Sequence, residues 1–140
     1  MKKVLIAEDN AVNRELLREL LEARGYRVLE ACNGQEAVQI LKETLPDILL
    51  LDLNMPVLDG FGVIARIRQD ATLAALPALA VTANAMRGDR ERILNSGFDG
   101  YLAKPINAVL LHQELERFLG RKGDEVTALA RTALPAIAAK

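Results

Sequence analysis

The sequence predicts an α/β domain in which a parallel sheet carries helices on both faces. Short aliphatic runs alternate with longer amphipathic stretches up to about residue 119, and strict alternation of this kind is typical of such sheets. The run at residues 48–51 is apolar at every position, as expected for a strand that helices cover on both sides. The length of 140 residues fits one domain and leaves little room for a second.

The first strand and helix are expected near the amino terminus. Residues 4–7 form a short aliphatic run that ends in charge, which indicates a strand. Residues 11–24 have the spacing of an amphipathic helix, and Gly25 is expected to end it in a left-handed conformation. The predicted buried face of this helix comprises Val12, Leu16, Leu17, Leu20 and Leu21.

The second and third units follow the same pattern. Residues 26–30 are less apolar and predict a strand at an edge of the sheet. Residues 35–44 predict a helix that stops before Pro46, because the residue before a proline avoids helical geometry. Residues 48–51 predict the buried strand, and residues 61–69 predict a helix after a loop marked by proline and glycine.

The fourth and fifth units complete the predicted domain. Pro77 opens a strand at residues 78–81, where proline at the first position is tolerated. Residues 87–95 predict a helix, residues 100–103 a short strand and residues 107–119 the last helix.

The domain is therefore expected to span residues 1–120. An Ala-rich tail follows at residues 121–140, which we expect to be flexible or to form a short helix. Twenty residues are too few for a further DNA-binding unit, so we expect output through contacts with other proteins.

Composition and charge exclude several classes of function. Lys and Arg number 18 against 19 Asp and Glu, which gives a net charge of −1 without the basic stripe of a nucleic-acid-binding protein. No apolar run approaches the ~18 residues that indicate a membrane span. The single cysteine, Cys32, cannot form an internal disulfide and favours a reducing cytoplasm. We therefore expect a cytoplasmic protein with no direct nucleic-acid contact and no membrane insertion.

Polar residues follow four of the predicted strands, at the point where each strand ends. Glu8 and Asp9 follow the first strand, Asp52 the third, Thr82 the fourth and Lys104 the fifth. Ligands of open α/β sheets bind at the carboxyl ends of the strands. We therefore expect these side chains to form one site.

The chemistry of this predicted site favours a divalent cation and a phosphoryl group. Three neighbouring carboxylates would raise one another's pKa unless a cation lay among them, and an oxygen-only ligand set favours Mg²⁺. Asp9 and Asp52 are the expected direct ligands, with Glu8 acting through water. A carboxylate can attack phosphorus to form an acyl phosphate. Mg²⁺, Lys104 and the Thr82 hydroxyl would stabilise the charge on the transferring group.

Four segments carry a resemblance to a known family. They are IAEDN at residues 6–10, LDLNMP at 51–56, AVTA at 80–83 and YLAKPI at 101–106. Together they resemble the receiver domains of two-component response regulators, the CheY-like family, in the style of stand-alone, DivK-like receivers or hybrid-kinase receivers. The resemblance covers residues 2–119 and implies a flavodoxin-like (βα)5 fold whose five-stranded sheet has the order 2-1-3-4-5.

The resemblance also implies a role for each site residue. Asp52 is the implied phosphoacceptor, and Lys104 holds the phosphoryl group. The implied metal ligands are Asp9, Asp52 and the backbone carbonyl of Asn54, with Glu8 supporting through water.

Further implied roles concern the switch and its lifetime. Thr82 would move to bind the phosphoryl group, and Tyr101 would turn inward behind it. Pro105 is expected to follow a cis peptide bond, although only ~5–6% of X-Pro bonds are cis. Asn54 and Asn84 are expected to tune the lifetime of the acyl phosphate.

The expected partners follow from this role. The phosphoryl donor is a sensor histidine kinase or a histidine phosphotransfer protein. Output is expected through a surface formed by the helix at 87–95, the strand at 100–103 and the helix at 107–119, or through onward phosphoryl transfer to a histidine of another protein. The protein is expected to be a monomer or a weak, phosphorylation-dependent dimer. It is not expected to be an enzyme that turns over external substrates.

His112 is expected at the surface, without a role in the chemistry.

Three other functions fit parts of the pattern. A haloacid-dehalogenase-type phosphatase needs a second aspartate where this chain has Asn54. A nucleotide-binding module needs a glycine-rich loop in place of residues 8–10. A degenerate receiver that serves only as a binding scaffold would lack some of the site residues, all of which this chain retains.

Overall fold

The computed structural model describes residues 1–83 and 87–120, so Asn84 and the predicted tail at residues 121–140 lie outside the described residues. Within the described part, five strands and five helices alternate as predicted. The strands are β1 (Lys3–Ala7), β2 (Arg27–Ala31), β3 (Ile48–Asp52), β4 (Ala78–Thr82) and β5 (Gly100–Ala103). The helices are α1 (Ala11–Glu22), α2 (Gly34–Glu43), α3 (Gly60–Gln69), α4 (Arg87–Asn95) and α5 (Ala108–Leu119). None of these helices has both the length and the apolar composition needed to cross a membrane.

The strands form one parallel sheet in the order β2-β1-β3-β4-β5, which confirms the predicted topology. β1 is hydrogen-bonded to β2 on one side and to β3 on the other. The strand order therefore reverses at β1 and β3, and the crevice beyond their carboxyl ends is where ligands of such sheets bind.

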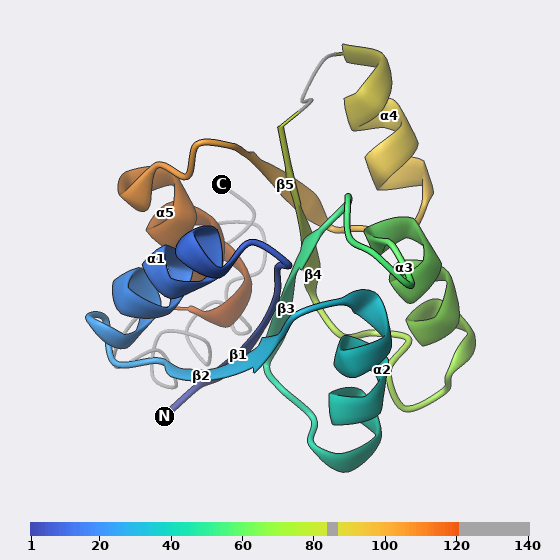
Figure 1. Ribbon diagram of the computed structural model, residues 1–140, viewed down its shortest axis with the longest axis horizontal. Coiled ribbons are helices and arrows are strands. Elements are labelled where there is room, and N and C mark those ends of the chain that lie inside the picture. Colours follow the sequence, from blue (N-terminus) through green and yellow to red (C-terminus); the bar gives the residue numbers. More distant parts are fainter. Residues whose placement is uncertain (84–86, 121–140) are drawn as a thin grey trace, which may run out of the picture.

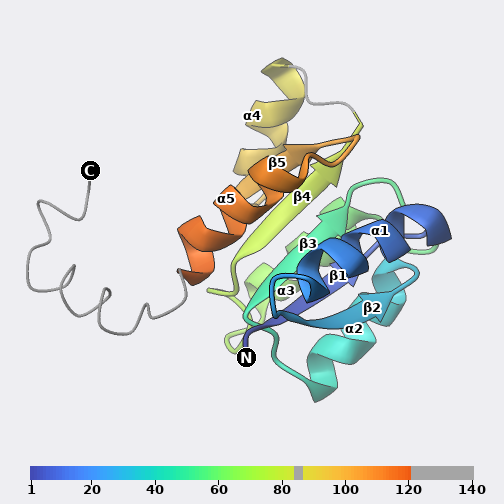
Figure 2. The same cartoon turned by 90° about the vertical axis from the view of Figure 1, so that its left-hand side faces the viewer.

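Helices cover both faces of the sheet (Figure 1). α1 and α5 lie on one face, toward the viewer in Figure 2, where Leu21 and Leu111 join the strands in an apolar cluster. α2, α3 and α4 lie on the other face, where Ile64 and Ile93 belong to a second cluster. Burial of each large aliphatic side chain stabilises the fold by about 1.5–3 kcal/mol, so the two clusters fix the helices on the sheet.

Asparagine or aspartate begins four of the helices. The side chains of Asn10, Asn33, Asp59 and Asn107 each accept a hydrogen bond from the backbone N–H three residues on, at 3.0, 2.8, 2.8 and 3.1 Å. Such a cap contributes about 1 kcal/mol. Because each cap lies on the loop that follows a strand, the caps fix where these loops turn into helices.

Two predicted site residues lie within strands and not in the loops after them. β3 ends at Asp52 and β4 at Thr82, each one residue later than the sequence predicts. The reason is that strand pairing continues to the site, with Asp52 opposite Val81 and Thr82 opposite Ala103. Strand geometry therefore fixes both side chains.

The predicted buried face of α1 is partly wrong. Leu17 and Leu21 are buried, but Val12 is 76% exposed and Leu16 43% exposed. Periodicity identifies the side of a helix that faces the core, but the sheet and α5 cover only part of that side here.

The expectation that His112 lies at the surface is also wrong. Its relative exposure is 9%, because it lies on the buried side of α5, one turn from the fully buried Leu115. Cys32, by contrast, is exposed.

Candidate functional site

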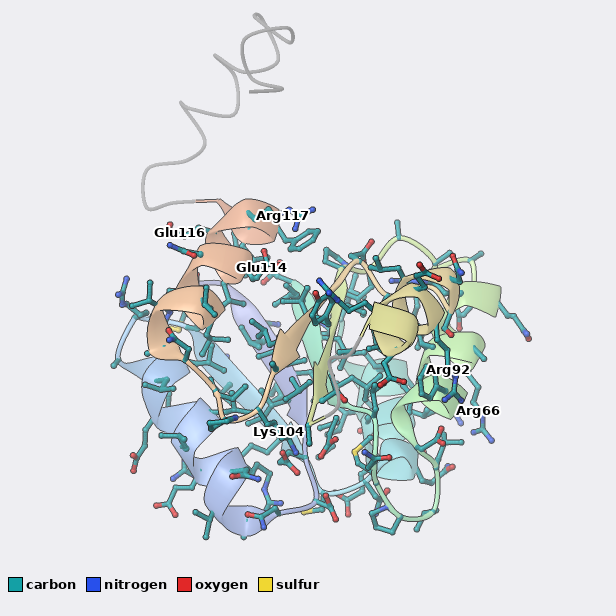
Figure 3. All side chains as sticks on the ribbon, turned by 90° about the horizontal axis from the view of Figure 1, so that it is seen from above. Arg66, Arg92, Lys104, Glu114, Glu116 and Arg117 are labelled. Carbon is teal, nitrogen blue, oxygen red and sulfur yellow. The ribbon has the colours of Figure 1, made fainter. Side chains whose placement is uncertain are left out.

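The site forms at the edge of the sheet where the strands end. Glu8 and Asp9 follow β1, Asp52 and Thr82 end β3 and β4, and Lys104 follows β5. In Figure 3 the labelled Lys104 lies at the ends of the central strands. The structure thus gathers the five residues that the sequence predicts for the site.

Asp52 is a buried carboxylate with its two oxygens in different surroundings. It is 3% exposed. Its Oδ1 accepts a hydrogen bond from the backbone N–H of Asn54 at 3.0 Å, and its Oδ2 lies 2.9 Å from Lys104 Nζ. Gly60 allows α3 to begin against this strand end, because a Cβ at that position would lie 2.6 Å from the Asp52 carbonyl oxygen.

Glu8 is the most buried charged group of the site, at 1% exposure. Its Oε2 accepts a hydrogen bond from the backbone N–H of Asn10 at 3.1 Å. Its Oε1 lies 2.9 Å from Lys104 Nζ, an ion pair whose geometry falls short of a hydrogen bond. Burial, reinforced by the neighbouring Asp52, raises the pKa of Glu8 to about 7, although Lys104 opposes the shift.

Lys104 holds the two buried carboxylates together. Burial disfavours its charge, but the contacts with Glu8 and Asp52 outweigh this cost and raise its pKa above the ordinary lysine value. Its backbone N–H donates to the Thr82 carbonyl oxygen at 2.8 Å. The Lys104–Pro105 peptide bond is cis, as expected.

Asp9 completes a group of acidic residues that could hold a metal ion. One carboxylate oxygen from each of Glu8, Asp9 and Asp52 lies within 4.8 Å of the others. The set offers only oxygen atoms, which suits a hard cation such as Mg²⁺. Glu8 Oε1 is buried and has no hydrogen bond beside its ion pair with Lys104, and the neighbouring Asp52 adds to the effect of burial in raising the pKa of Glu8. These residues therefore fit a divalent cation.

Thr82 and Tyr101 connect the site to the α4 side of the sheet. Thr82 is 2% exposed. Tyr101 lies in β5, where it is half-buried against the cluster beneath α2, α3 and α4. Its hydroxyl accepts a hydrogen bond from Arg90 Nη1 of α4 at 3.2 Å. The predicted switch residues thus lie on adjacent strands, β4 and β5.

Comparison with known proteins identifies the family. The sequence profile of the response regulator receiver domain matches residues 4–116. The chain belongs to this family of receiver domains. It is thus a receiver domain of two-component and phosphorelay response regulators, as its motifs predict.

Several receivers are similar over most of this receiver's length. The polar-differentiation response regulator DivK of Brucella anthropi is 40% identical over 119 residues, covering 85% of this chain and 97% of DivK. The receiver domain of sensor histidine kinase PA1611 from Pseudomonas aeruginosa, crystallised with a magnesium ion in its active-site cleft, has a TM-score of 0.80 at 38% identity, covering 86% and 98% of the two chains. The complex of the Saccharomyces cerevisiae histidine phosphotransfer protein Ypd1 with the Ssk1 receiver domain matches with a TM-score of 0.78 at 31% identity, covering 84% and 88%.

Proposed function

We propose that this receiver accepts a phosphoryl group on Asp52 from a phosphohistidine of a sensor histidine kinase or a histidine phosphotransfer protein. The observation that carries the proposal is the arrangement around Asp52, a buried carboxylate with one oxygen on Lys104 and an acidic pair beside it. The Ypd1–Ssk1 complex, in which a phosphotransfer protein binds a similar receiver, supports the choice of donor.

Mg²⁺ is the proposed cofactor. Asp9, Asp52 and the backbone carbonyl of Asn54 are the proposed ligands, and Glu8 acts through water. When bound, Mg²⁺ supplies positive charge for the phosphoryl oxygens. The magnesium ion in the similar PA1611 receiver supports this assignment.

The transfer itself is a displacement at phosphorus. An oxygen of Asp52 forms a bond to phosphorus as the bond between phosphorus and the histidine nitrogen breaks. The nitrogen keeps the electron pair, and the ring leaves as imidazole with one proton from solvent. The residues around Asp52 position the carboxylate and stabilise charge, which is most of what phosphoryl transfer requires.

Lys104 changes partner in this scheme. Before transfer its ammonium group contacts both Asp52 and Glu8. After transfer, the phosphoryl oxygens carry the larger negative charge and attract the ammonium group. This exchange stabilises the phosphorylated product.

The output surface is the face formed by α4, β5 and α5. Thr82 gains a hydrogen bond to the phosphoryl group only in the active arrangement, and this differential contact shifts the population between two states. Tyr101 then moves inward, which separates its hydroxyl from Arg90 and changes the surface that a downstream protein binds. Coupling of this kind is typically worth about 1–3 kcal/mol.

The proposal also covers the location, the oligomeric state and the phosphorylation lifetime of the protein. The protein acts in the cytoplasm as a monomer or a weak, phosphorylation-dependent dimer. Its chemistry is limited to its own phosphorylation and dephosphorylation, without turnover of external substrates. Asn54 and Asn84 tune the lifetime of the acyl phosphate.

Intact-mass measurement after incubation with acetyl phosphate and Mg²⁺ tests the proposal. We expect the wild-type protein and the control variant Asp70→Asn to gain one phosphoryl group. Asp70 is an exposed residue at the carboxyl end of α3. Asp52→Asn, and wild-type protein in EDTA, should gain none. Equal labelling of Asp52→Asn and wild type would rule out the assignment.

A further inference from the structure

We propose that Arg14 is a positioning residue that holds the acidic loop of residues 8–10 in its metal-binding shape. The inference rests on the proposed Mg²⁺ site. It concerns a residue of α1 that lies outside the acidic cluster of Glu8, Asp9 and Asp52 and that the sequence pattern does not single out.

Arg14 binds the backbone of the acidic loop directly. Its Nη1 donates a hydrogen bond to the carbonyl oxygen of Glu8 at 2.8 Å. Its Nε lies 3.5 Å from Oε1 of Glu30, a residue of β2. The Arg14 side chain is only 18% exposed, so solvent competes weakly for these contacts. Arg14 therefore ties the loop after β1 to the neighbouring strand.

Other contacts hold the loop at Glu8 and Asn10. The Glu8 N–H donates to the carbonyl oxygen of Ala31 at 3.1 Å, the Asn10 N–H donates to Glu8 Oε2 at 3.1 Å, and Glu8 Oε1 lies 2.9 Å from Lys104 Nζ. The Asn10 side chain also caps α1. Without Arg14, the Glu8 carbonyl would lose its charged donor. The negative charges of Glu8 and Asp9 repel each other, so the loop would spread and the acidic oxygens would move apart.

Arginine suits this role better than lysine. The guanidinium group is a planar fork that can hold a carbonyl and a carboxylate at once, whereas an ammonium group is a point charge on a flexible stem. Arg14→Lys therefore keeps the positive charge but loses the planar group that binds the carbonyl and the carboxylate together.

Positioning and charge make opposite predictions for this residue. If Arg14 acted only as a positive charge near the site, its removal would strengthen the binding of a cation. If Arg14 holds the loop, its removal weakens binding. The sign of the effect on Mg²⁺ affinity separates the two.

The chain offers a matched control in Arg18. It lies one turn further along α1, contacts Glu30 at 3.4 Å and Glu22 at 3.9 Å, and is 38% exposed. Arg18→Met removes the same charge and the same Glu30 partner as Arg14→Met while leaving the Arg14–Glu8 hydrogen bond intact.

Isothermal titration of the full chain with Mg²⁺ tests the inference. We expect Arg14→Met and Arg14→Lys to bind Mg²⁺ roughly 10-fold more weakly than wild type, the lower end of the range for partners that orient metal ligands. Arg18→Met should bind as wild type does or slightly more tightly. Glu30→Gln, which leaves both arginines in place, should show a smaller loss. It also keeps the test valid if the Arg14 variants do not fold.

A second measurement uses no metal. In EDTA, the backbone amide of Asn10 should exchange its hydrogen faster in Arg14→Met than in Arg18→Met, because its bond to Glu8 depends on the loop shape. Unchanged or tighter Mg²⁺ binding by Arg14→Met would overturn the positioning role of Arg14 and leave the proposed metal site in place. Failure of the wild-type protein to bind Mg²⁺ would overturn the metal site and this inference with it.

Discussion

Lys104 and Asp52, 52 positions apart in the sequence, form a 2.9 Å contact between Nζ and Oδ2. The same ammonium nitrogen lies 2.9 Å from Glu8 Oε1. One cation thus joins the loop after β5 to the end of β3 and to the loop after β1. In the unphosphorylated protein it offsets the repulsion between two buried carboxylates.

Removal of Lys104 should make stability depend more strongly on pH. In Lys104→Met, Glu8 and Asp52 lose their shared cation, and the pKa of Glu8 rises further above about 7. In EDTA at pH 8, above the Glu8 pKa of the wild-type protein, we expect the free energy of unfolding to fall by about 1–3 kcal/mol. At pH 5 the loss should be smaller, because Glu8 is protonated. Urea unfolding at both pH values measures this, with Lys42→Met of α2 as the control. An equal loss at both pH values would contradict the arrangement.

His112 should make the protein less stable in mild acid. Burial lowers the pKa of His112 below 6.5, the charge of Arg24 lowers it further, and Glu116 opposes the shift. Its Nδ1 is buried without a hydrogen-bond partner. A histidine whose folded pKa is depressed contributes stability above pH 6.5, and this contribution is lost as the pH falls.

The difference in unfolding free energy between wild type and His112→Leu isolates this effect. Other groups that titrate in this range, such as Glu8, do so in both proteins and cancel in the difference. We expect the wild type to lose stability relative to the variant as the pH falls from 7 toward 5. A difference that stays constant with pH would show that the histidine does not titrate in this way.

Much of the fold and site follows from the sequence because parallel topology is so restrictive. Once β1, β3, β4 and β5 are recognised from their apolar runs, their carboxyl ends must share an edge. Glu8, Asp52 and Lys104 must therefore lie at that edge, however far apart they are in the chain. Strand β5 and helix α4 begin and end at the predicted residues.

Contacts between side chains of different elements could not be predicted in this way. Periodicity gives the direction of a helix face but not how much of it is covered, so Val12 is exposed where burial was expected. His112 is buried where exposure was expected, because the covered part of α5 is wider than its apolar residues indicate. Arg14 and Arg92 resemble any exposed helical arginine in the sequence. Their roles depend on a carbonyl of another element and on the ring of Phe61, which only the folded structure brings close.

Arg92 should anchor α4 to α3 through the ring of Phe61. The guanidinium carbon lies 4.1 Å from the ring centroid, and Phe61 meets Phe98 edge-on at 6.3 Å. A double-mutant cycle with Arg92→Met and Phe61→Leu should give a coupling energy of about 0.5–1 kcal/mol, as for other exposed cation–π pairs. The loss of the Phe61–Phe98 contact cancels in the cycle. Strict additivity of the two substitutions would show that the stack contributes nothing.

Arg68 should be essential for the stability of the loops that lead into β4 and β5, at the end of the sheet opposite the site. Its guanidinium group donates to the carbonyl oxygens of Leu76 at 2.7 Å and Gly97 at 2.8 Å, and its Nη2 lies 3.0 Å from Asp99 Oδ2. Arg68→Lys cannot satisfy these partners together and should lower the free energy of unfolding by about 3 kcal/mol. Arg66→Lys is the control, because Arg66 is exposed on the same helix (Figure 3). Similar stability of the two variants would refute the role of Arg68.

Asp52 is the residue proposed to carry the phosphoryl group, and every other role at the site depends on it. Borohydride reduction of the phosphorylated protein converts an acyl phosphate to an alcohol, and peptide mass spectrometry then locates the reduced side chain. After phosphorylation by acetyl phosphate with Mg²⁺, the account predicts one reduced residue, at position 52. It also predicts none when Mg²⁺ is removed. Reduction at another carboxylate such as Asp9, or none at position 52 in phosphorylated protein, would contradict it.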